Sequence, residues 1–313
     1  MRFVDKAEVA RRLTYEAAIP LVRQAMIAVS AGRTRQLLRA ILPLAGERMF
    51  GVMPGALGET APFGAKLISV FPDNFERGLP SHQGLIVLFD PQSGAAVCAV
   101  DAGEVTAIRT AAASAVATDA LARPEAHRLA ILGYGEQAAT HIRALTRVRP
   151  VSEVVVWGRS AERAARFAAR MEAETSLPCA GAMDARAAVA TADIVCTVTA
   201  AADPVLAGAW LAPGSHVNLV GAGHAGQAEA DGDVLERSLF IVDSREGVET
   251  QGGEYRRARR AGRDVAIAAE IGEVLAGRAP GRLSAPQITV YKSLGHVAQD
   301  LACAWALFSG EGL

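Results

Sequence analysis

Two apolar patterns follow one another along the chain. Near the N-terminus, apolar side chains recur at positions 13, 17, 21 and 25, which predicts helix over residues 1 to 40, with Pro20 interrupting it or starting a segment. From 48 to 100, short apolar runs are separated by turn signals, and DPQSG at 90–94 is typical of a hairpin loop. We therefore expect an antiparallel sheet in this part of the chain.

An alanine-rich stretch at 104–122 predicts a helix that ends before Pro124, and strands then alternate with helices. The expected strands are short and almost continuously apolar: LAIL at 129–132, EVVVW at 153–157, DIVCTV at 193–198, HVNLV at 216–220 and LFIV at 239–242. Strands without polar alternation, spaced by helices, indicate a parallel sheet covered on both faces. The polar stretch 251–264 is interpreted as a solvated loop and helix with surface arginines.

Length and composition narrow the class of protein. At about 150 residues per domain, 313 residues suggest two domains, and 51% hydrophobic with 21% charged residues is typical of a folded protein. A net charge of −1 without a basic tract argues against a nucleic-acid partner. The cysteines form no C-x-x-C metal or redox motif, and we see no signal peptide or membrane span. We expect a cytoplasmic protein without a metal site.

The segment LAILGYGEQAATHIRAL at 129–145 has the pattern of a dinucleotide-binding turn. Gly133 and Gly135 follow the expected strand, permit a tight turn and let a pyrophosphate approach the backbone, while the next helix offers its N-terminal amides. Ala138 replaces the usual third glycine and preserves close packing. We include Glu136 and Gln137 in the expected cofactor site. An ordinary strand–turn–helix is the alternative, but the surrounding β-α-β series favours dinucleotide binding.

The end of the next expected strand bears on the choice of dinucleotide. An NAD site usually has Asp or Glu there, whereas this chain has Gly158, Arg159 and Ser160, with Arg163 one turn later. A guanidinium and a hydroxyl suit a 2′-phosphate, so we favour NADP(H) over NAD(H). The alternative is that Arg159 is a surface residue at the start of a helix.

From about residue 46 to 300, the chain resembles the ornithine cyclodeaminase/mu-crystallin family, nearest its mu-crystallin-like ketimine reductases. The segments that carry the resemblance are GAKLISVFPDN, LPSHQGLIVLFDPQSGA, DAGEVTAIRTAAASAVAT, LGYGEQA, VWGRS, ADIVCTVT, PGSHVNLVGA and YKSLGHVAQD. The resemblance implies an α/β fold with a Rossmann domain at 119–295. It also implies a mixed α+β substrate-binding and dimerisation domain at 1–118 and 296–313, in a homodimer or larger homo-oligomer.

The resemblance also implies the substrate residues. Arg48, Lys66 and Arg109 match family positions around a substrate carboxylate, for which arginine forks and a lysine charge are suited. A partly desolvated Lys66 beside two arginines has a lowered pKa in this hypothesis and supplies the proton of imine reduction. Ser81 and His82 match a segment that approaches the cofactor, although His82 as a structural histidine is an equal alternative.

Further residues are assigned to the cofactor. Thr197 and Thr199 follow an expected Rossmann strand and are predicted to face the nicotinamide ribose. The remaining expected cofactor residues are Thr110, Val220, Gly221, Ser293, Leu294 and Gly295. Ordinary turn structure is the alternative for 293–295.

One departure from the family pattern separates two chemistries. Ornithine cyclodeaminases carry an aspartate after the strand that corresponds to HVNLVGA, and it is linked to deamination and ring closure. This chain has Gly223 at that position, followed by His224, and Asp231 lies too far along to replace it. His224 is a candidate acid or base, with an ordinary loop residue as the alternative. Reduction of a preformed imine does not need that aspartate.

We therefore expect an NADPH-preferring reductase of small imino acids. Its substrates would be cyclic imines, such as pyrroline-2-carboxylate or piperideine-2-carboxylate, or an α-keto acid with an amine. The alternatives are an ornithine cyclodeaminase, an alanine-type amino-acid dehydrogenase, and a non-catalytic NADPH-binding protein of the crystallin kind. The presence of Arg48, Lys66 and Arg109 together favours catalysis, because a binding protein would not need all of them.

Overall fold

The computed structural model describes residues 1–313, with the side chains of all of them except Phe75 and Glu76. The chain forms two compact units, which we call the N-terminal unit (1–110 and 296–313) and the Rossmann unit (111–295). The first division lies inside helix α3 (Ala102–Leu121), as does the expected boundary at 118/119, and the second lies at 295/296.

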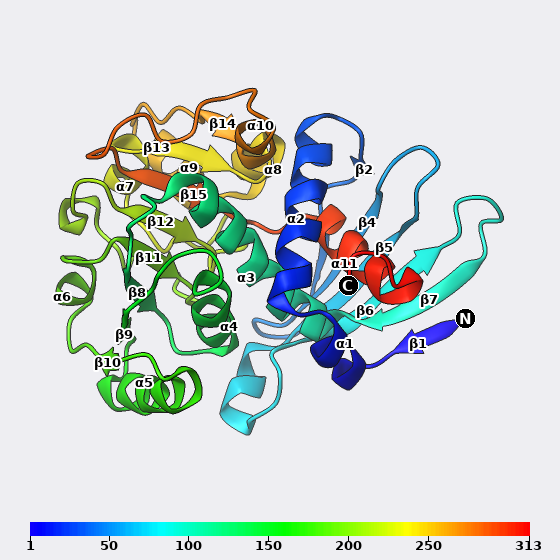
Figure 1. The fold of residues 1–313 in the computed structure, drawn as a ribbon, viewed down its shortest axis with the longest axis horizontal. Helices are drawn as coiled ribbons and strands as arrows, with labels where there is room; N and C mark the ends of the chain where they lie inside the picture. The colour runs from blue at the N-terminus through cyan, green and yellow to red at the C-terminus, as the bar shows by residue number, and fades with distance from the viewer. The chain divides into compact units, whose positions relative to one another are not determined.

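The N-terminal unit is built on a largely antiparallel sheet (Figure 1). Its strand order is β1-β7-β6-β5-β4-β2, and β3 also pairs with β4. Its elements are β1 (Arg2–Val4), α1 (Lys6–Arg12), α2 (Tyr15–Ser30), β2 (Arg35–Gln36), β3 (Ala40–Pro43), β4 (Met49–Ala56), β5 (Phe63–Val70), η1 (Pro72–Arg77), β6 (His82–Phe89), β7 (Ala96–Asp101) and the C-terminal α11 (Val297–Ser309). The predicted antiparallel sheet is confirmed, as is the hairpin at 90–94, where the amide of Asp90 donates to the carbonyl of Ala95.

One face of this sheet is packed and the other is not. Along β5, Gly64, Lys66 and Ile68 are buried while the residues between them are more exposed. Helix α11 contacts β4, β5 and β6 and lies beside α2 (Figure 1). Burial alternates along β5 because successive side chains of a strand point to opposite faces, and one of these faces is the core.

The single helix expected over residues 1–40 is wrong in its extent. Asp5 and Thr14 each accept an amide hydrogen bond as helix N-caps, so α1 and α2 are separate helices. Gly32 adopts a φ of +67° just past α2, where a left-handed residue ends a helix, and strands follow. Pro20 lies inside α2 and does not interrupt it.

The Rossmann unit has a parallel sheet in the order β10-β9-β8-β11-β12-β15-β13-β14 (Figure 1). Its elements are β8 (Arg128–Leu132), α4 (Glu136–Leu145), β9 (Glu153–Trp157), α5 (Ala161–Thr175), β10 (Cys179–Gly181), α6 (Ala185–Val189), β11 (Ile194–Thr197), η2 (Gly208–Trp210), β12 (His216–Leu219), α7 (Gly232–Glu236), β13 (Leu239–Val242), α8 (Arg245–Gln251), α9 (Gly253–Arg260), β14 (Ala269–Glu270), α10 (Ile271–Leu275) and β15 (Thr289–Lys292). Every residue of β11, β12 and β15 is buried, so both faces of the sheet are covered. This confirms the predicted α/β class, although the sequence analysis missed β10, β14 and β15.

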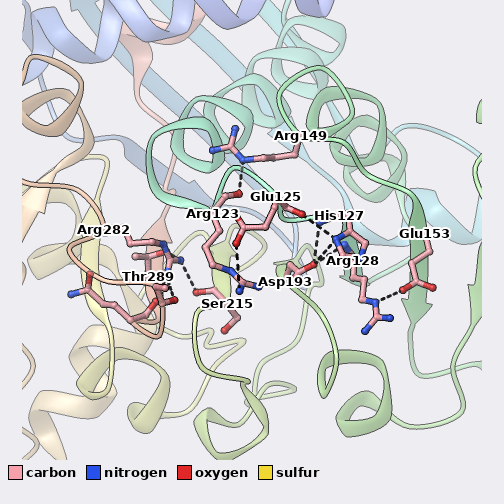
Figure 2. Close-up of polar contacts among 12 residues, drawn as sticks. Arg123, Glu125, His127, Arg128, Arg149, Glu153, Asp193, Ser215, Arg282 and Thr289 are labelled. Atoms are coloured by element: carbon pink, nitrogen blue, oxygen red, sulfur yellow. Dashed lines mark hydrogen bonds and ion pairs between the residues drawn. The ribbon is translucent and has the colours of Figure 1, made fainter.

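The amino ends of the central strands are joined by a network of arginines and one aspartate (Figure 2). Asp193, just before β11, accepts from the guanidinium of Arg123 and from the amides of His127 and Arg128 at the start of β8. Arg282 donates to Ser215, just before β12, and to the hydroxyl of Thr289 in β15. These contacts satisfy main-chain carbonyls and amides at the amino ends of the strands. They therefore hold the edge of the parallel sheet that lies opposite the carboxyl ends.

Within the polar stretch 251–264, the predicted helix is present as α9 and most of its arginines are at least partly exposed. The interpretation as a wholly solvated segment is wrong for Glu254. Its side chain is buried and pairs with the ammonium of Lys292 at 3.0 Å. A charge that is placed in the interior needs such a partner, and the local sequence does not identify it.

Across the residues that the structure describes, every helix is too short or too polar to span a lipid bilayer. Among the same residues, the acidic, histidine and cysteine side chains form no group that could hold a metal ion.

We expect Arg149→Leu to destabilise the Rossmann unit. The guanidinium of Arg149 donates to the carbonyls of Asp119, Ala122 and Arg123 at the C-terminus of α3, at 2.8 to 3.0 Å. Because this side chain is 8% exposed, its loss removes a donor from partly buried carbonyls, at a cost of about 1–3 kcal/mol. Urea unfolding measures the loss.

Arg166→Leu is the control, because Arg166 is 67% exposed in a pair within one helix, and such pairs contribute about 0.5 kcal/mol or less. Equal unfolding midpoints for the two variants would contradict the role of Arg149.

Candidate active site

The N-terminal unit buries two cations around one aspartate. Lys66 in β5 and Arg109 in α3 both donate to Oδ1 of Asp300 in α11, each at 3.0 Å. Arg109 also donates to Oε1 of Gln299 at 2.9 Å, which fixes the plane of its guanidinium. The exposed fractions of Lys66, Arg109 and Asp300 are 2%, 5% and 0%. The structure therefore brings together two predicted residues and adds a third that the sequence analysis missed.

The electrostatics of this Lys66–Arg109–Asp300 cluster suit an anionic ligand. Burial raises the pKa of Asp300, but the charges of Arg109 and Lys66 outweigh it and hold that pKa below its usual value. Burial lowers the pKa of Lys66 to about 8, Asp300 opposes the change, and Arg109 adds to it. Two cations and one carboxylate leave a formal net charge of +1. The cluster can bind a carboxylate and can exchange a proton near neutral pH.

Asp300 has unused hydrogen-bonding capacity. Its Oδ2 atom is buried and has no hydrogen-bond partner among the described residues. Arg39 lies close enough for its charge to lower the pKa of Lys66, and the sequence analysis did not identify it. A signal for Asp300 exists in the sequence, since it is an acid within the largely apolar helix VAQDLACAW.

The other residues expected around the substrate do not all lie apart from this cluster. The pKa of the His82 imidazole is lowered to about 4 by loss of hydration and by the charges of Lys66, Arg109 and Arg39, so His82 lies near it. Arg48 pairs with Asp73 and lies over the ring of Phe71, at 5.1 Å from its centroid, with its side chain 41% exposed. The hydroxyl of Ser81 lies 2.9 Å from Nδ1 of His82, an exposed residue at the start of β6. Thr110 is buried in α3 beside Arg109. The structure thus does not place Arg48 with Lys66 and Arg109.

In the Rossmann unit, the turn between β8 and α4 fits a pyrophosphate. Gly133 has a φ of +129°, and a Cβ there would lie 2.8 Å from the carbonyl oxygen of Val198. Gly135 is the N-cap of α4 without a side-chain hydrogen bond, and a Cβ on it would meet open space. The turn therefore lets an anion approach the N-terminus of α4, which begins at Glu136 and whose dipole favours a negative charge. Oε1 of Gln137 is buried without a hydrogen-bond partner among the described residues.

The strand end beyond this turn holds the cationic residues predicted for a 2′-phosphate. Arg159 and Arg163 are exposed, and Ser160 caps α5 by accepting from the amide of Arg163. A Cβ on Gly158 would lie 2.2 Å from the ring of Tyr134, so the glycine allows this aromatic ring to pack against the strand end. These side chains can hold a phosphate at the amino end of α5.

The threonines predicted to face a ribose are instead bonded to a buried acid. Thr197 and Thr199 donate their hydroxyls to the carboxylate of Glu229, at 2.8 and 2.7 Å. The same carboxylate accepts from the amide of Gly221, which directly follows Val220. Glu229 is a second residue that the sequence analysis missed.

Two further predicted segments are held by side chains. Oδ2 of Asp243 accepts from the amides of Leu294 and Gly295, at 2.7 and 2.8 Å, while Ser293 is buried. Nδ1 of His224 accepts from the amide of Gly226 at 3.2 Å. Because an amide can only donate, Nδ1 carries no proton in this arrangement.

Comparison with known proteins shows the family. The model of the ornithine cyclodeaminase/mu-crystallin family matches residues 2–310, so the chain belongs to this family and the resemblance in its motifs is confirmed. Ketimine reductase mu-crystallin of Mus musculus is 36% identical over 274 residues, which cover 87% of this chain and 84% of the relative. Delta(1)-pyrroline-2-carboxylate reductase of Paracoccus denitrificans is 39% identical over 249 residues, which cover 77% of each chain.

A solved structure extends the similarity to the fold. The Delta(1)-pyrroline-2-carboxylate reductase of Thermococcus litoralis, in complex with NADH and L-proline, has a TM-score of 0.94 and 30% identity to this chain. The match covers 98% of this chain and 96% of that one.

Proposed function

We propose that this member of the ornithine cyclodeaminase/mu-crystallin family is a reductase that uses a nicotinamide dinucleotide to reduce small imino acids. The observation that carries the proposal is the buried cluster of Lys66, Arg109 and Asp300. It combines a net positive charge for a carboxylate with a lysine whose pKa is about 8.

The reaction needs three contributions. The carbon of the C=N bond gains a hydride, which the bound dinucleotide supplies and thereby becomes oxidised. The nitrogen gains a proton, and we assign this proton to the ammonium of Lys66. Arg109 holds the substrate carboxylate, because its fork has donors beyond those bonded to Asp300 and Gln299.

The relatives favour cyclic substrates. Two similar proteins are named pyrroline-2-carboxylate reductases, and one of their structures contains L-proline, the amine that corresponds to this imine. The ketimine reductases of the mu-crystallin type match almost the whole chain. Pyrroline-2-carboxylate is therefore our first candidate substrate, followed by piperideine-2-carboxylate.

Cyclodeamination is disfavoured by the loop after β12. Gly223 stands where the cyclodeaminases have an aspartate, and a glycine has no group that can take up a proton. The imidazole of His224 accepts from its own loop through Nδ1, which leaves Nε2 as the protonated nitrogen of the neutral ring. A role for His224 as a proton donor stays a prediction.

We further propose that the enzyme prefers NADPH. Arg159, Ser160 and Arg163 offer two guanidinium groups and a hydroxyl at the strand end where NAD-specific proteins have an acidic residue. A 2′-phosphate would complement these positive charges, whereas the ribose diol of NADH would lack its usual carboxylate partner.

The open face of the N-terminal sheet supports a homodimer. Apolar side chains from three strands, β1, β5 and β6, face the same open side: Phe3, Phe63, Leu67, Leu85, Val87 and Phe89. Leu67 pairs with Leu85 across β5 and β6, and Phe3 is 60% exposed. Such a surface on a monomer would be costly in water. We propose that a second copy of the chain covers it through a two-fold symmetric contact.

The function is tested by NADPH oxidation with pyrroline-2-carboxylate, piperideine-2-carboxylate, and pyruvate plus methylamine. We expect oxidation with a cyclic imine, and we expect Lys66→Met to lower turnover about 100-fold or more because the acid is lost.

In the wild type, kcat/KM should fall as pH rises through the pKa of Lys66, about 8. Asp300→Asn should move this fall to lower pH, because the charge of Asp300 raises the pKa of Lys66.

The imine substrate also changes its protonation with pH, but this contribution to the pH profile is the same for the wild type and the variants, so it does not affect the comparison. Lys6→Met is the control, since Lys6 is 57% exposed and pairs only weakly with Glu104, at 3.6 Å. Near-normal turnover in Lys66→Met would remove Lys66 as the acid. Tight NADPH binding without oxidation of any substrate would favour a non-catalytic binding protein.

Cofactor preference is tested with Arg159→Asp. We expect the dissociation constant for NADPH to rise about 10- to 100-fold more than that for NADH, because a charged hydrogen bond to the 2′-phosphate is replaced by repulsion. Arg166→Asp, in α5 beyond Arg163 and 67% exposed, should leave the ratio of the two constants unchanged. Equal losses for both dinucleotides would refute this assignment.

The homodimer is tested with Val87→Asp, which places a charge in the middle of the apolar face. We expect light scattering to show a dimer for the wild type and a monomer for the variant, with unchanged helix and strand content. Leu283→Asp is the matched control, because Leu283 is an apolar residue of the Rossmann unit that is 70% exposed. A wild-type chain that is monomeric at all concentrations would refute the proposal.

A further inference from the structure

Glu229 carries the most heavily bonded carboxylate of the Rossmann unit that the structure describes. Its exposed fraction is 0%. Oε1 accepts from the amide and the hydroxyl of Thr199, at 2.6 and 2.7 Å. Oε2 accepts from the hydroxyl of Thr197 at 2.8 Å and from the amides of Gly221 and Ala222, at 2.6 and 3.2 Å. One side chain thus satisfies five donors.

These donors come from the ends of two neighbouring strands. Thr197 is the last residue of β11 and pairs with Leu219, the last residue of β12, so the chain diverges just beyond both. Leu132, at the end of β8, pairs with Thr197 on its other side and leads directly into Gly133. Open α/β sheets bind their ligands outside the carboxyl ends of the strands, where the strand order reverses. Glu229 therefore lies at the ligand-binding edge of this sheet.

The five donors favour the ionised form of Glu229, against the effect of burial. Each of its oxygens receives a main-chain amide, which can donate but cannot accept, and both receive a hydroxyl as well. Burial raises the pKa of Glu229, and the charge of Lys292 opposes this effect. Lys292 in turn pairs with Glu254, whose Oε1 accepts from the amide of Glu229 at 3.1 Å. The three buried groups have a formal net charge of −1.

Glu229 also closes the loop that precedes it. Its carboxylate holds the amides of Gly221 and Ala222 at one end, and its own amide is held by Glu254 at the other. Between these ends, the guanidinium of Arg257 donates to the carbonyl of Gly226 at 3.3 Å. The loop 221–228 is therefore fastened to α9 and to the ends of β11 and β12.

We infer that Glu229 is a positioning residue for the nicotinamide end of the dinucleotide. It fixes the ends of β11 and β12 and the start of the loop 221–228, and this inference rests on the proposed function. A carboxylate buried for stability alone would be an expensive choice, because an apolar side chain of the same size fills space without desolvating a charge. Glu229 instead fixes amides and hydroxyls at the ligand-binding edge before the ligand arrives, and this preorganisation explains why a charge is buried here.

Glutamine cannot replace this carboxylate, although it has nearly the same shape. Its amide nitrogen would face at least one main-chain amide, at Thr199 or at Gly221, so two donors would oppose each other. One strand end would have to move. The adenosine half of the site, at Gly135 and Arg159, lies at the N-termini of α4 and α5 and should keep its geometry.

The test is calorimetric titration of the full-length protein with two ligands, NADPH and 2′-phospho-ADP-ribose, which lacks the nicotinamide. For Glu229→Gln we expect the dissociation constant of NADPH to rise about 10- to 100-fold, since buried donors lose their acceptor. The constant for 2′-phospho-ADP-ribose should stay within about two-fold. Glu229→Asp, which keeps the charge but is shorter, should show the same selective loss to a smaller extent, and it serves as the test if the glutamine variant does not fold.

Glu236→Gln is the matched control, because Glu236 belongs to an exposed ion pair with Arg263 in the same unit and should change neither constant. Equal weakening of both ligands in a folded Glu229 variant would show a purely structural role and overturn the inference alone. Unchanged NADPH binding would also overturn it. A wild-type protein that binds neither ligand would overturn the proposed function and this inference together.

Discussion

The burial of ionised carboxylates is the constraint on which both candidate sites depend. Asp300 has no exposed surface, and it remains an anion only because Lys66 and Arg109 both donate to it. The same contacts place the two cations side by side, although their own charges repel. A carboxylate without these partners would take up a proton, and the two cations without the carboxylate would not remain together in the interior. The positive cluster exists because its counter-ion is buried with it.

The Rossmann unit uses the same principle at the ends of its strands. Parallel strands end with amides that no neighbouring strand can satisfy, and side-chain carboxylates accept from them at two places. Glu229 serves β11 and β12, while Asp243 accepts from Leu294 and Gly295 after β15. At the opposite edge, Asp193 and Arg282 do the equivalent work at the strand starts (Figure 2). The carboxyl edge of the sheet, where such folds bind ligands, is thus held by the carboxylates of Glu229 and Asp243.

Local sequence patterns predicted the turns and strands whose formation depends on residues close together in the chain. The turn at Gly133–Gly135, the hairpin at 90–94 and the apolar strands follow from spacing within a few residues, and all are present. The partners of the buried charges follow from contacts between distant segments. Lys66 and Asp300 are 234 positions apart, and no period in the sequence joins them. Arg48 shows the reverse case, because this cation, expected near the substrate, pairs with Asp73, and its place at the substrate stays a prediction.

The loop 221–228 is held to its surroundings through its main chain. The contacts that fasten it use main-chain atoms: the amides of Gly221 and Ala222, the carbonyl of Ala222, which accepts from Lys292, and the carbonyl of Gly226. Glu229, Glu254 and Arg257 supply the side chains, and all lie outside the loop. The side chain of His224 bonds within the loop, to the amide of Gly226, and is not one of these fastening contacts. The loop is therefore fastened on both sides of position 223, where this chain has the glycine that disfavours cyclodeamination.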